Sequence, residues 1–582
     1  MITKVKVQYL FFIFFCLLRF SNTLAQPVTP WLGPNRAADP YRYSSVKSAV
    51  YTNATVGCAH PLAALVGAEI MKAGGNAFDA AIAVQYALAV VYPGAGNIGG
   101  GGFLVGRTAA GKTIALDYRE TAPAAASRNM YLDEQGNPQA KQSLYGAKSG
   151  GVPGSVAGMF ATQPYAKFTA KTLIQPAIDL AEFGYAITKQ EADRLNDARE
   201  DFIKYSSGAT AFVKEGKWKA GDTLVQKELA ATLRHIRDKG QKGFYEGPVA
   251  AFIVREMSKG SNAKGIISEA DLKNYKVRKR EALSWEWNGN TIIGMPPPSS
   301  GGIIVLQLLN MANKDRLARY GFQTANSVHL MAEAERRAFA DRSLHMGDPD
   351  FYKVPLKTLR NPAYLHKRML SFDSSKTTPS TGVLPGNVKE SEETTHISIA
   401  DKAGNVVSIT TTLNNSYGSR CVVSGAGFIL NDEMDDFSLK PGVPNFYGAV
   451  GGEANAIAPG KRMLSSMSPT LVINKGKASA VCGSPGGTTI PTSVFQVLEN
   501  MFTFGMSATE AVAAPRFHHQ WLPDELFVEP DFKQSTRNEL KAFGWKITER
   551  SSIGRTEVIK FMPDGRMESA ADIRGDDSVA GF

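Results

Sequence analysis

The chain has 582 residues, of which 43% are hydrophobic and 20% are charged. This composition describes a globular protein with a large core and excludes a predominantly disordered chain. The formal net charge of +11 is spread along the sequence, and its densest cluster, Lys276–Arg280, is followed by Glu281 and lacks interleaved aromatic residues. We therefore expect this cluster to be a solvated face, and we expect no nucleic-acid partner.

The N-terminus is typical of an export signal. Lys4 and Lys6 precede an apolar run, Val7–Leu18, and small residues then lead to a plausible cleavage site after Ala25. The run has 12 residues, whereas a membrane-spanning helix needs about 20. We predict that residues 1–25 are a signal peptide and that the mature protein is exported, periplasmic or secreted. A lasting membrane anchor is the alternative.

Residues 61–91 read as two helices separated by Gly74–Gly75, because apolar residues recur at helical spacing on both sides of this pair. A run of glycines, Gly99–Gly102, follows. Glycine allows the backbone to approach another backbone or a ligand closely, and a tight structural turn explains the run equally well.

Residues 371–393 are rich in Ser, Thr, Pro and charge, and they predict an exposed loop. A hairpin follows, since residues 394–400 and 406–413 alternate in polarity around a turn that contains glycine. A three-residue hairpin loop, Lys402–Gly404, places Thr394 opposite Thr412, with their Cβ atoms about 4.5–5.5 Å apart. A loop of two or four residues would remove this match.

The hairpin has two different faces. The apolar face is expected to belong to the core and carries Ile397, Ile399, Val407, Ile409 and Leu413. The polar face either meets solvent, as one face of most antiparallel pairs does, or hosts a reaction; it carries Thr394, His396, Ser398, Ser408, Thr410 and Thr412.

Four further groups could bind or stabilise a substrate. The acidic group Glu433–Asp436 would suit an ammonium ligand, or it is an acidic loop or the start of a helix. The hydroxyls of Ser465–Ser468 would suit a carboxylate, or they cap a turn. Gly483–Gly487 can direct backbone N–H groups to one point, as an oxyanion hole does, or form a plain turn. Arg119 is a carboxylate binder by type, or it pairs with a nearby acid such as Asp117.

Other patterns argue against metal and cofactor chemistry. The side chains of adjacent His518 and His519 diverge and no third ligand is suitably spaced, so we expect neither a metal site nor a catalytic role for them. No familiar cofactor-binding motif is present, and no cofactor is expected. Cys58, Cys421 and Cys482 lack paired spacing and are expected to be small buried residues.

From about residue 45 to the C-terminus, ordered motifs resemble those of the γ-glutamyltransferases, a family of the N-terminal nucleophile hydrolase superfamily. The motifs include GGNAFDAAIAV, AGNIGGGGF, LDYRETAP, MPPPSSGG, TTHISIAD, TLNNSYGS, NDEMDDFS, PGVPNFYG, SSMSPT and GSPGG. The resemblance implies an α+β fold, a four-layer αββα sandwich. It also implies that the chain cleaves itself between Glu393 and Thr394 into a heavy subunit, residues 26–393, and a light subunit, residues 394–582, which together form one intertwined domain.

The same resemblance implies a role for each group. Thr394 would be the nucleophile, Thr412 would position it, and Gly486 and Gly487 would form the oxyanion hole. Residues implied to hold the α-carboxylate of a γ-glutamyl group are Arg119, Ser465 and Ser466. Residues implied to hold its α-ammonium are Asn414, Glu433 and Asp436. Tyr447 would belong to a lid over the bound group.

The implied activity is that of a γ-glutamyltransferase and glutathione hydrolase without metal or cofactor. Its partners would be glutathione or other γ-glutamyl compounds, with water, amino acids or peptides as acceptors. The freed α-amine of Thr394, with an ordinary pKa of about 7.7–8.0, could serve as the base.

The sequence leaves two alternative functions open. An acylase for glutaryl or β-lactam side chains would leave Glu433 and Asp436 without a cation. A γ-glutamyl-binding protein without turnover would not need Thr394, Thr412 or the paired glycines.

Overall fold

The computed structural model describes residues 31–33, 35–259, 263–383, 394–440 and 452–582. Its centre is a pair of seven-stranded sheets. The first sheet has the order β19 (Ser578–Gly581), β2 (Ala54–Cys58), β10 (Thr394–Asp401), β11 (Val406–Thr412), β3 (Gly101–Arg107), β4 (Thr113–Asp117), β7 (Arg278–Lys279). The second has the order β1 (Ser48–Tyr51), β18 (Met567–Ala570), β17 (Glu557–Phe561), β13 (Lys477–Gly483), β12 (Thr470–Asn474), β9 (Asn290–Gly294), β8 (Leu283–Trp287).

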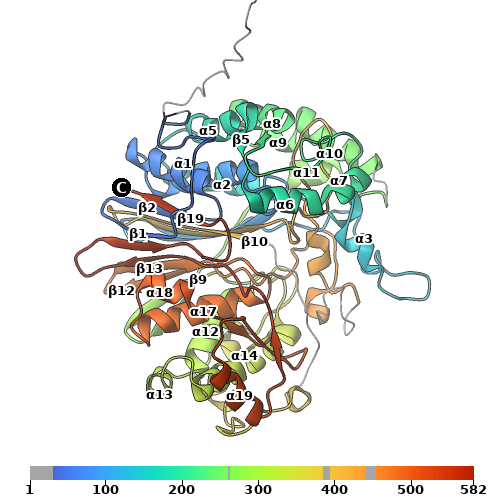
Figure 1. Cartoon of the computed structure of the whole chain (residues 1–582). Coiled ribbons are helices and arrows are strands. Elements are labelled where there is room, and N and C mark those ends of the chain that lie inside the picture. Colours follow the sequence, from blue (N-terminus) through green and yellow to red (C-terminus); the bar gives the residue numbers. More distant parts are fainter. Residues whose placement is uncertain (1–30, 34, 260–262, 384–393, 441–451) are drawn as a thin grey trace, which may run out of the picture.

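Helices lie on the outer side of each sheet (Figure 1). Those associated with the first sheet are α1 (Pro61–Lys72), α2 (Ala77–Val91), α4 (Ser155–Thr162), α5 (Ala170–Phe183), α8 (Lys227–Lys239), α9 (Lys242–Tyr245) and α10 (Gly247–Lys259). Those associated with the second are α12 (Gly301–Met311), α13 (Lys314–Tyr320), α14 (Ala325–His345), α16 (Pro362–Arg368), α17 (Thr489–Phe502), α18 (Ala508–Ala513) and α19 (Gln534–Ala542).

The remaining elements are short. The helices are α3 (Ala140–Leu144), α6 (Lys189–Asp197), α7 (Arg199–Tyr205), α11 (Glu269–Asn274) and α15 (Leu356–Leu359). The strands form two small sheets, β5 (Tyr185–Ala186) with β6 (Thr223–Leu224), and β14 (Phe517–His518) with β15 (Leu526–Val528) and β16 (Ile547–Glu549).

Three apolar clusters separate the layers. Ile397 and Ile399 of β10, which contacts α2, belong to a cluster with apolar residues of α1 and α2 on the outer side of the first sheet. Phe103 of β3 and Val481 of β13 belong to a cluster between the two sheets. A third cluster joins the second sheet to its helices and includes Val494 of α17. The mixed α and β class expected from the sequence is confirmed.

The predicted pair of helices is confirmed as α1 and α2. The side chain of Asn76 accepts hydrogen bonds from the backbone at the start of α2, and Asp79 Oδ2 accepts one from Asn76 N, which completes a capping box. The helices pack closely, because a Cβ at Gly67 would lie only 2.6 Å from Val84 Cγ2. Gly74 between them has a φ of +111°, a conformation that favours glycine.

The predicted hairpin register is also confirmed. Thr394 lies opposite Thr412 and Ala400 lies opposite Val406 in the antiparallel pair of β10 and β11. β10 also pairs with β2, so this sheet combines strands that precede Thr394 with strands from Thr394 onward.

The polar face of the hairpin does not meet solvent, which corrects the simpler of the two expectations. Its side chains point toward the second sheet, where Ser398 Oγ donates to Glu557 O and Ser408 Oγ donates to Cys482 O. His396 is fully buried and contacts Thr410 Oγ1 at 2.9 Å. Hydroxyl groups are tolerated between the sheets because each of these bonds supplies a partner.

The loop prediction for residues 371–393 is wrong in part. Ser380 is buried, its backbone N donates to Asp524 Oδ2, and its hydroxyl donates to Trp521 O. Trp521 Nε1 donates to the carbonyl of Val383 at 2.6 Å. Long-range contacts with the C-terminal part of the chain therefore bury Ser380 and Val383, whereas residues 371–379 stay exposed or partly exposed, as predicted. Residues 384–393 lie outside the described ranges.

Other sequence expectations have mixed outcomes. Cys58, Cys421 and Cys482 are buried, as predicted, and each is a free cysteine. Lys276, Arg278 and Lys279 are exposed, whereas Arg280 forms ion pairs with Asp117 and Asp350. The predicted signal peptide lies outside the described residues. In the part of the chain that is described, no helix is long and apolar enough to cross a membrane.

Candidate active site

Thr394 opens β10 and faces a small pocket that contains most of the residues singled out from the sequence. Its neighbour across the hairpin, Thr412, ends β11, and both are almost fully buried. The pocket is lined by Arg119, Thr394, Thr412, Asn414, Asp436, Ser465, Ser466, Met467, Gly487 and Ile490. Segments distant in sequence therefore converge on one hydroxyl pair.

The turn after β11 connects Thr412 to Asn414. The Thr412 hydroxyl accepts a hydrogen bond from Asn414 N at 2.7 Å. Asn414 has a φ of +77°, which asparagine tolerates better than most residues. Its Nδ2 donates to Asp432 O at 3.1 Å. The turn thus fixes a hydroxyl and an amide at the pocket.

Arg119 lies just beyond the end of β4 and is buried. Its Nη1 lies 2.6 Å from Glu433 Oε2, and its Nη2 contacts Asp436 Oδ2. Asp117 instead pairs with Arg280 at 2.9 Å and with Arg462 at 3.2 Å. The expectation that Arg119 pairs with an acid is therefore confirmed, but the side-chain partners are Glu433 and Asp436, and not Asp117.

Burial and charge together set the protonation of this cluster. Burial raises the pKa of Glu433 well above its usual value, although Arg119 acts in the opposite direction. Burial also raises the pKa of Glu120 to about 7. Burial disfavours the charged guanidinium, but Glu433 and Asp436 outweigh it and raise the pKa of Arg119. A guanidinium beside carboxylates complements a group that carries both an anion and a cation.

The two serines belong to a segment held by backbone and side-chain bonds. Ser465 O accepts from Ser300 N at 2.7 Å and from Ser300 Oγ at 2.8 Å. Arg342 of α14 donates to Ser300 Oγ at 3.0 Å and to Ser466 Oγ at 3.1 Å. Arg342 therefore orients Ser466 at the pocket.

The paired glycines adopt left-handed conformations, with φ of +125° at Gly486 and +56° at Gly487. Gly486 O accepts hydrogen bonds from Thr489 N at 3.0 Å and from Thr489 Oγ1 at 2.7 Å. α17 begins at Thr489, so the positive end of its dipole lies beside these glycines and favours a negative charge there.

Comparison with known families matches residues 63–582 to the family described as Gamma-glutamyltranspeptidase. The chain belongs to this family. It is 46% identical over 523 residues to the "Glutathione hydrolase proenzyme" of Escherichia coli K12, covering 89% of this chain and 90% of that protein. It is 35% identical to the "Acylase ACY 1 proenzyme" of Pseudomonas sp. SE83, covering 89% and 91% respectively.

Solved structures agree with the family assignment. The cephalosporin acylase of Bacillus halodurans has a TM-score of 0.81 and 27% identity, and the match covers 94% of this chain and 99% of that one. A chain of the Helicobacter pylori gamma-glutamyltranspeptidase has 45% identity and a TM-score of 0.55, and the match covers 59% of this chain and 97% of that one.

Some buried polar residues of this gamma-glutamyltranspeptidase family member were not found from the sequence. Glu120 is fully buried with Oε2 at 3.6 Å from Arg119 Nη1. Asn455 accepts from Leu464 N at 3.0 Å and donates to Asp436 O at 2.6 Å, so it joins the acidic and serine segments. Glu120 had the signal of its place beside Arg119 in LDYRETAP, and Arg342 lies in MAEAERRAFADRS, another motif of the resemblance, although neither was given a role. Asn455 had no such signal.

His518 and His519 lie elsewhere in the structure and do not line the pocket. His518 contacts Thr492 Oγ1 at 2.9 Å, and His519 Nε2 lies 3.3 Å from Asp524 Oδ1. Burial lowers the pKa of His518 to about 3 and that of His519 to about 4. Two predicted site residues do not line the pocket but contact residues that do: Gly486 precedes Gly487, and Glu433 pairs with Arg119. Glu393 and Tyr447 lie outside the described residues.

Proposed function

We propose that the protein is a γ-glutamyltransferase and glutathione hydrolase in which Thr394 is the nucleophile. The observation that carries this proposal is the pocket in which Thr394 adjoins the Arg119 guanidinium and the Asp436 carboxylate. The relatives named as glutathione hydrolase proenzymes in Escherichia coli and Pseudomonas aeruginosa, each 46% identical to this chain, support it.

We further propose that the two sheets and their outer helices form the four-layer αββα sandwich of N-terminal nucleophile hydrolases, and that the chain cleaves itself before Thr394. The products would be a heavy subunit, residues 26–393, and a light subunit, residues 394–582. They would remain together because each sheet combines strands from both parts. The word "proenzyme" in the names of the relatives supports this processing.

In the precursor, the hydroxyl oxygen of Thr394 would attack the carbonyl carbon of Glu393. The peptide C–N bond breaks, an ester forms, and the nitrogen of Thr394 takes a proton. Water then hydrolyses the ester, which releases Glu393 with a free carboxylate and restores the hydroxyl. The product gains an α-amine beside the hydroxyl that it can deprotonate.

During turnover, the same hydroxyl would attack the γ-carbonyl carbon of the substrate while the α-amine takes its proton. We propose that the N–H groups of Gly486 and Gly487 stabilise the resulting oxyanion. The departing amine receives the proton and leaves a γ-glutamyl ester on Thr394. Water then yields glutamate, whereas an amino acid or peptide amine yields a new γ-glutamyl compound.

The charged groups of the pocket would select the amino-acid end of the substrate. Arg119, Ser465 and Ser466 would bind its α-carboxylate. The α-ammonium would lie near Asn414, Glu433 and Asp436. Arg119 already contacts both acids. The incoming zwitterion adds one anion and one cation, so the net charge of the cluster does not change.

Tyr447 is proposed as part of a lid. The N-terminal signal and export are proposed from the sequence.

An acylase activity is the second candidate because the chain is 35% identical to a protein named Acylase ACY 1. The acyl groups of glutaryl substrates lack an α-ammonium, so Glu433 and Asp436 would gain nothing from binding them. The acidic pair therefore favours γ-glutamyl substrates.

The test compares the purified protein with Thr394→Ala on glutathione and on two anilides, γ-glutamyl-p-nitroanilide and glutaryl-p-nitroanilide. We expect Thr394-dependent glutamate release and a strong preference for the γ-glutamyl anilide. A preference for the glutaryl compound would indicate an acylase, and saturable binding without turnover would indicate a binding protein.

A further inference from the structure

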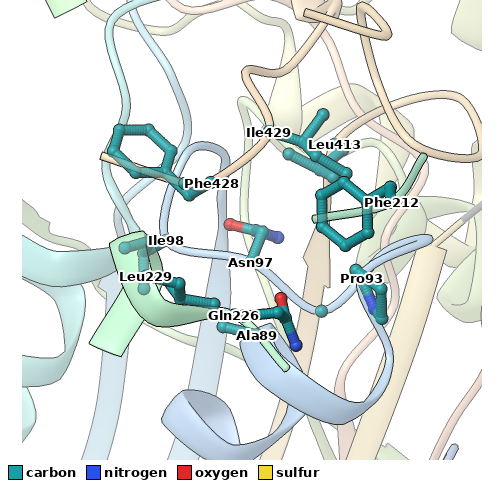
Figure 2. A pocket seen from close by; sticks show the side chains of 12 residues that line it. Ala89, Pro93, Asn97, Ile98, Phe212, Gln226, Leu229, Leu413, Phe428 and Ile429 are labelled. Atoms are coloured by element: carbon teal, nitrogen blue, oxygen red, sulfur yellow. The ribbon is translucent and has the colours of Figure 1, made fainter. Parts of the chain in front are cut away.

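Asn97 is a buried polar residue between α2 and β3, and it lines a second small pocket. Figure 2 shows it with Leu413 and Ile429 on one side and Gln226 on the other. Only 3% of its surface is exposed, so its amide depends on protein partners. Leu413, which lines this pocket, directly follows Thr412 of the candidate active site.

Both ends of the Asn97 amide are bonded. Its Nδ2 donates to Thr412 O and to Ala95 O, each at 2.9 Å, and lies 3.2 Å from Thr411 Oγ1. Its Oδ1 accepts from Gly100 N at 3.0 Å and from Ser155 Oγ at 2.7 Å. Carbonyl partners on one end and donors on the other fix the orientation of the amide.

The glycine run explains how Asn97 reaches the end of β11. A Cβ at Gly100 would lie 2.1 Å from Thr412 O, and a Cβ at Gly102 would lie 2.5 Å from Thr410 O. The backbone of residues 100–102 therefore lies directly against β11. Of the two uses expected for these glycines, the structure supports the approach of backbone to backbone.

We propose that Asn97 is a positioning residue for Thr412 and, through it, for Thr394. Thr412 is the last residue of β11, where the strand pairing ends. Its backbone carbonyl is held by Asn97, and its hydroxyl is held by Asn414 N at 2.7 Å. These two bonds fix the direction in which the Thr412 side chain leaves the strand, opposite Thr394.

This inference rests on the proposed roles of Thr394 and Thr412. It extends them by assigning a function to Asn97, which does not line the pocket that contains Thr394 and reaches it only through Thr412. A displacement of about 1 Å in a reacting group can cost about 100-fold in rate. Loss of the Asn97 amide is therefore expected to act on catalytic rate more than on substrate binding.

The test uses Asn97→Leu, which keeps the size of the side chain and removes its hydrogen bonds. Gln226→Met is the matched control, because Gln226 lies in the same pocket, is 1% exposed, and donates to Val90 O at 2.8 Å without contacting Thr412. We would measure the rate of self-cleavage, the kcat and KM for γ-glutamyl-p-nitroanilide per cleaved molecule, and the unfolding temperature.

We expect Asn97→Leu to reduce self-cleavage and kcat by about 10- to 100-fold with KM changed by less than about threefold. Gln226→Met should keep both rates within about threefold of the parent protein, even where it changes the unfolding temperature as much as Asn97→Leu does. Equal losses in the two variants, or a normal kcat in Asn97→Leu, would overturn the proposal.

Asn97→Asp provides a second test if Asn97→Leu fails to fold. A protonated carboxyl can donate to Thr412 O, whereas an ionised one cannot. The ratio of its kcat to that of the parent should rise as pH falls from about 9 to about 5. A ratio that does not change with pH would contradict the role of the Asn97 donor. If Thr394→Ala still cleaves itself or turns over substrate, the proposed function fails independently of Asn97.

Discussion

Replacement of Asp436 by alanine tests the proposed recognition of the substrate ammonium. The Asp436 side chain is 21% exposed and contacts Arg119, which keeps Glu433 as a second partner at 2.6 Å. The variant therefore does not leave a buried guanidinium without a carboxylate, and we expect it to fold. Its main loss would be one carboxylate beside the α-ammonium of the substrate.

A hydrogen bond between charged groups contributes about 1.5–3 kcal/mol. At about 1.4 kcal/mol for each factor of ten, Asp436→Ala should lower kcat/KM for γ-glutamyl-p-nitroanilide by about 10- to 150-fold. Activity on glutaryl-p-nitroanilide, which lacks the ammonium, should change by less than about threefold. The control is Glu453→Gln, which removes an exposed ion pair with Arg128 and should have little effect. Equal losses on both anilides would refute the assigned role.

Three further predictions concern folding and export. Gly483→Ala should lower the free energy of unfolding by about 1–3 kcal/mol, because its Cβ would lie 2.2 Å from His396 Cε1 between the sheets; an unchanged urea midpoint would contradict this. Burial lowers the pKa of His396 to about 3. As the pH falls, this histidine is therefore protonated in the unfolded state before it is protonated in the folded state. The free energy of unfolding is thus highest above about pH 6.5 and decreases as the pH falls toward 3. His396→Gln should reduce the slope of unfolding free energy by up to about 1.4 kcal/mol per pH unit between pH 6 and 4, and an equal slope in urea titrations would exclude this linkage. N-terminal sequencing of the exported protein should start near Gln26; recovery of Met1 would disprove signal cleavage.

The sequence was sufficient for the parts of the fold that depend on local pattern. Alternating residues and a glycine-containing turn defined the hairpin well enough to pair Thr394 with Thr412. Helical spacing around Gly74 likewise predicted α1 and α2. In both cases the signal lies within one short segment, where side-chain periodicity and turn chemistry determine the structure.

Features that depend on distant segments were not predictable in the same way. Arg119 pairs with acids more than 300 positions later in the chain, although Asp117 lies two residues away. Ser380 is buried by Trp521 despite its polar surroundings in sequence. Asn97 has no distinctive spacing, and only the fold shows that its amide meets Thr412. Tertiary contacts decide the burial of such polar residues, so local sequence carries little signal for them.

The central claim is that Thr394 cleaves the chain and then serves as its nucleophile. Intact-mass spectrometry and N-terminal sequencing of the purified protein and of Thr394→Ala test it most directly. We expect two fragments from the parent protein, the smaller beginning TTHIS at Thr394, and one inactive, uncleaved chain from the variant. A parent protein that is fully active as a single chain, or a Thr394→Ala variant that is cleaved at the same bond, would contradict the account.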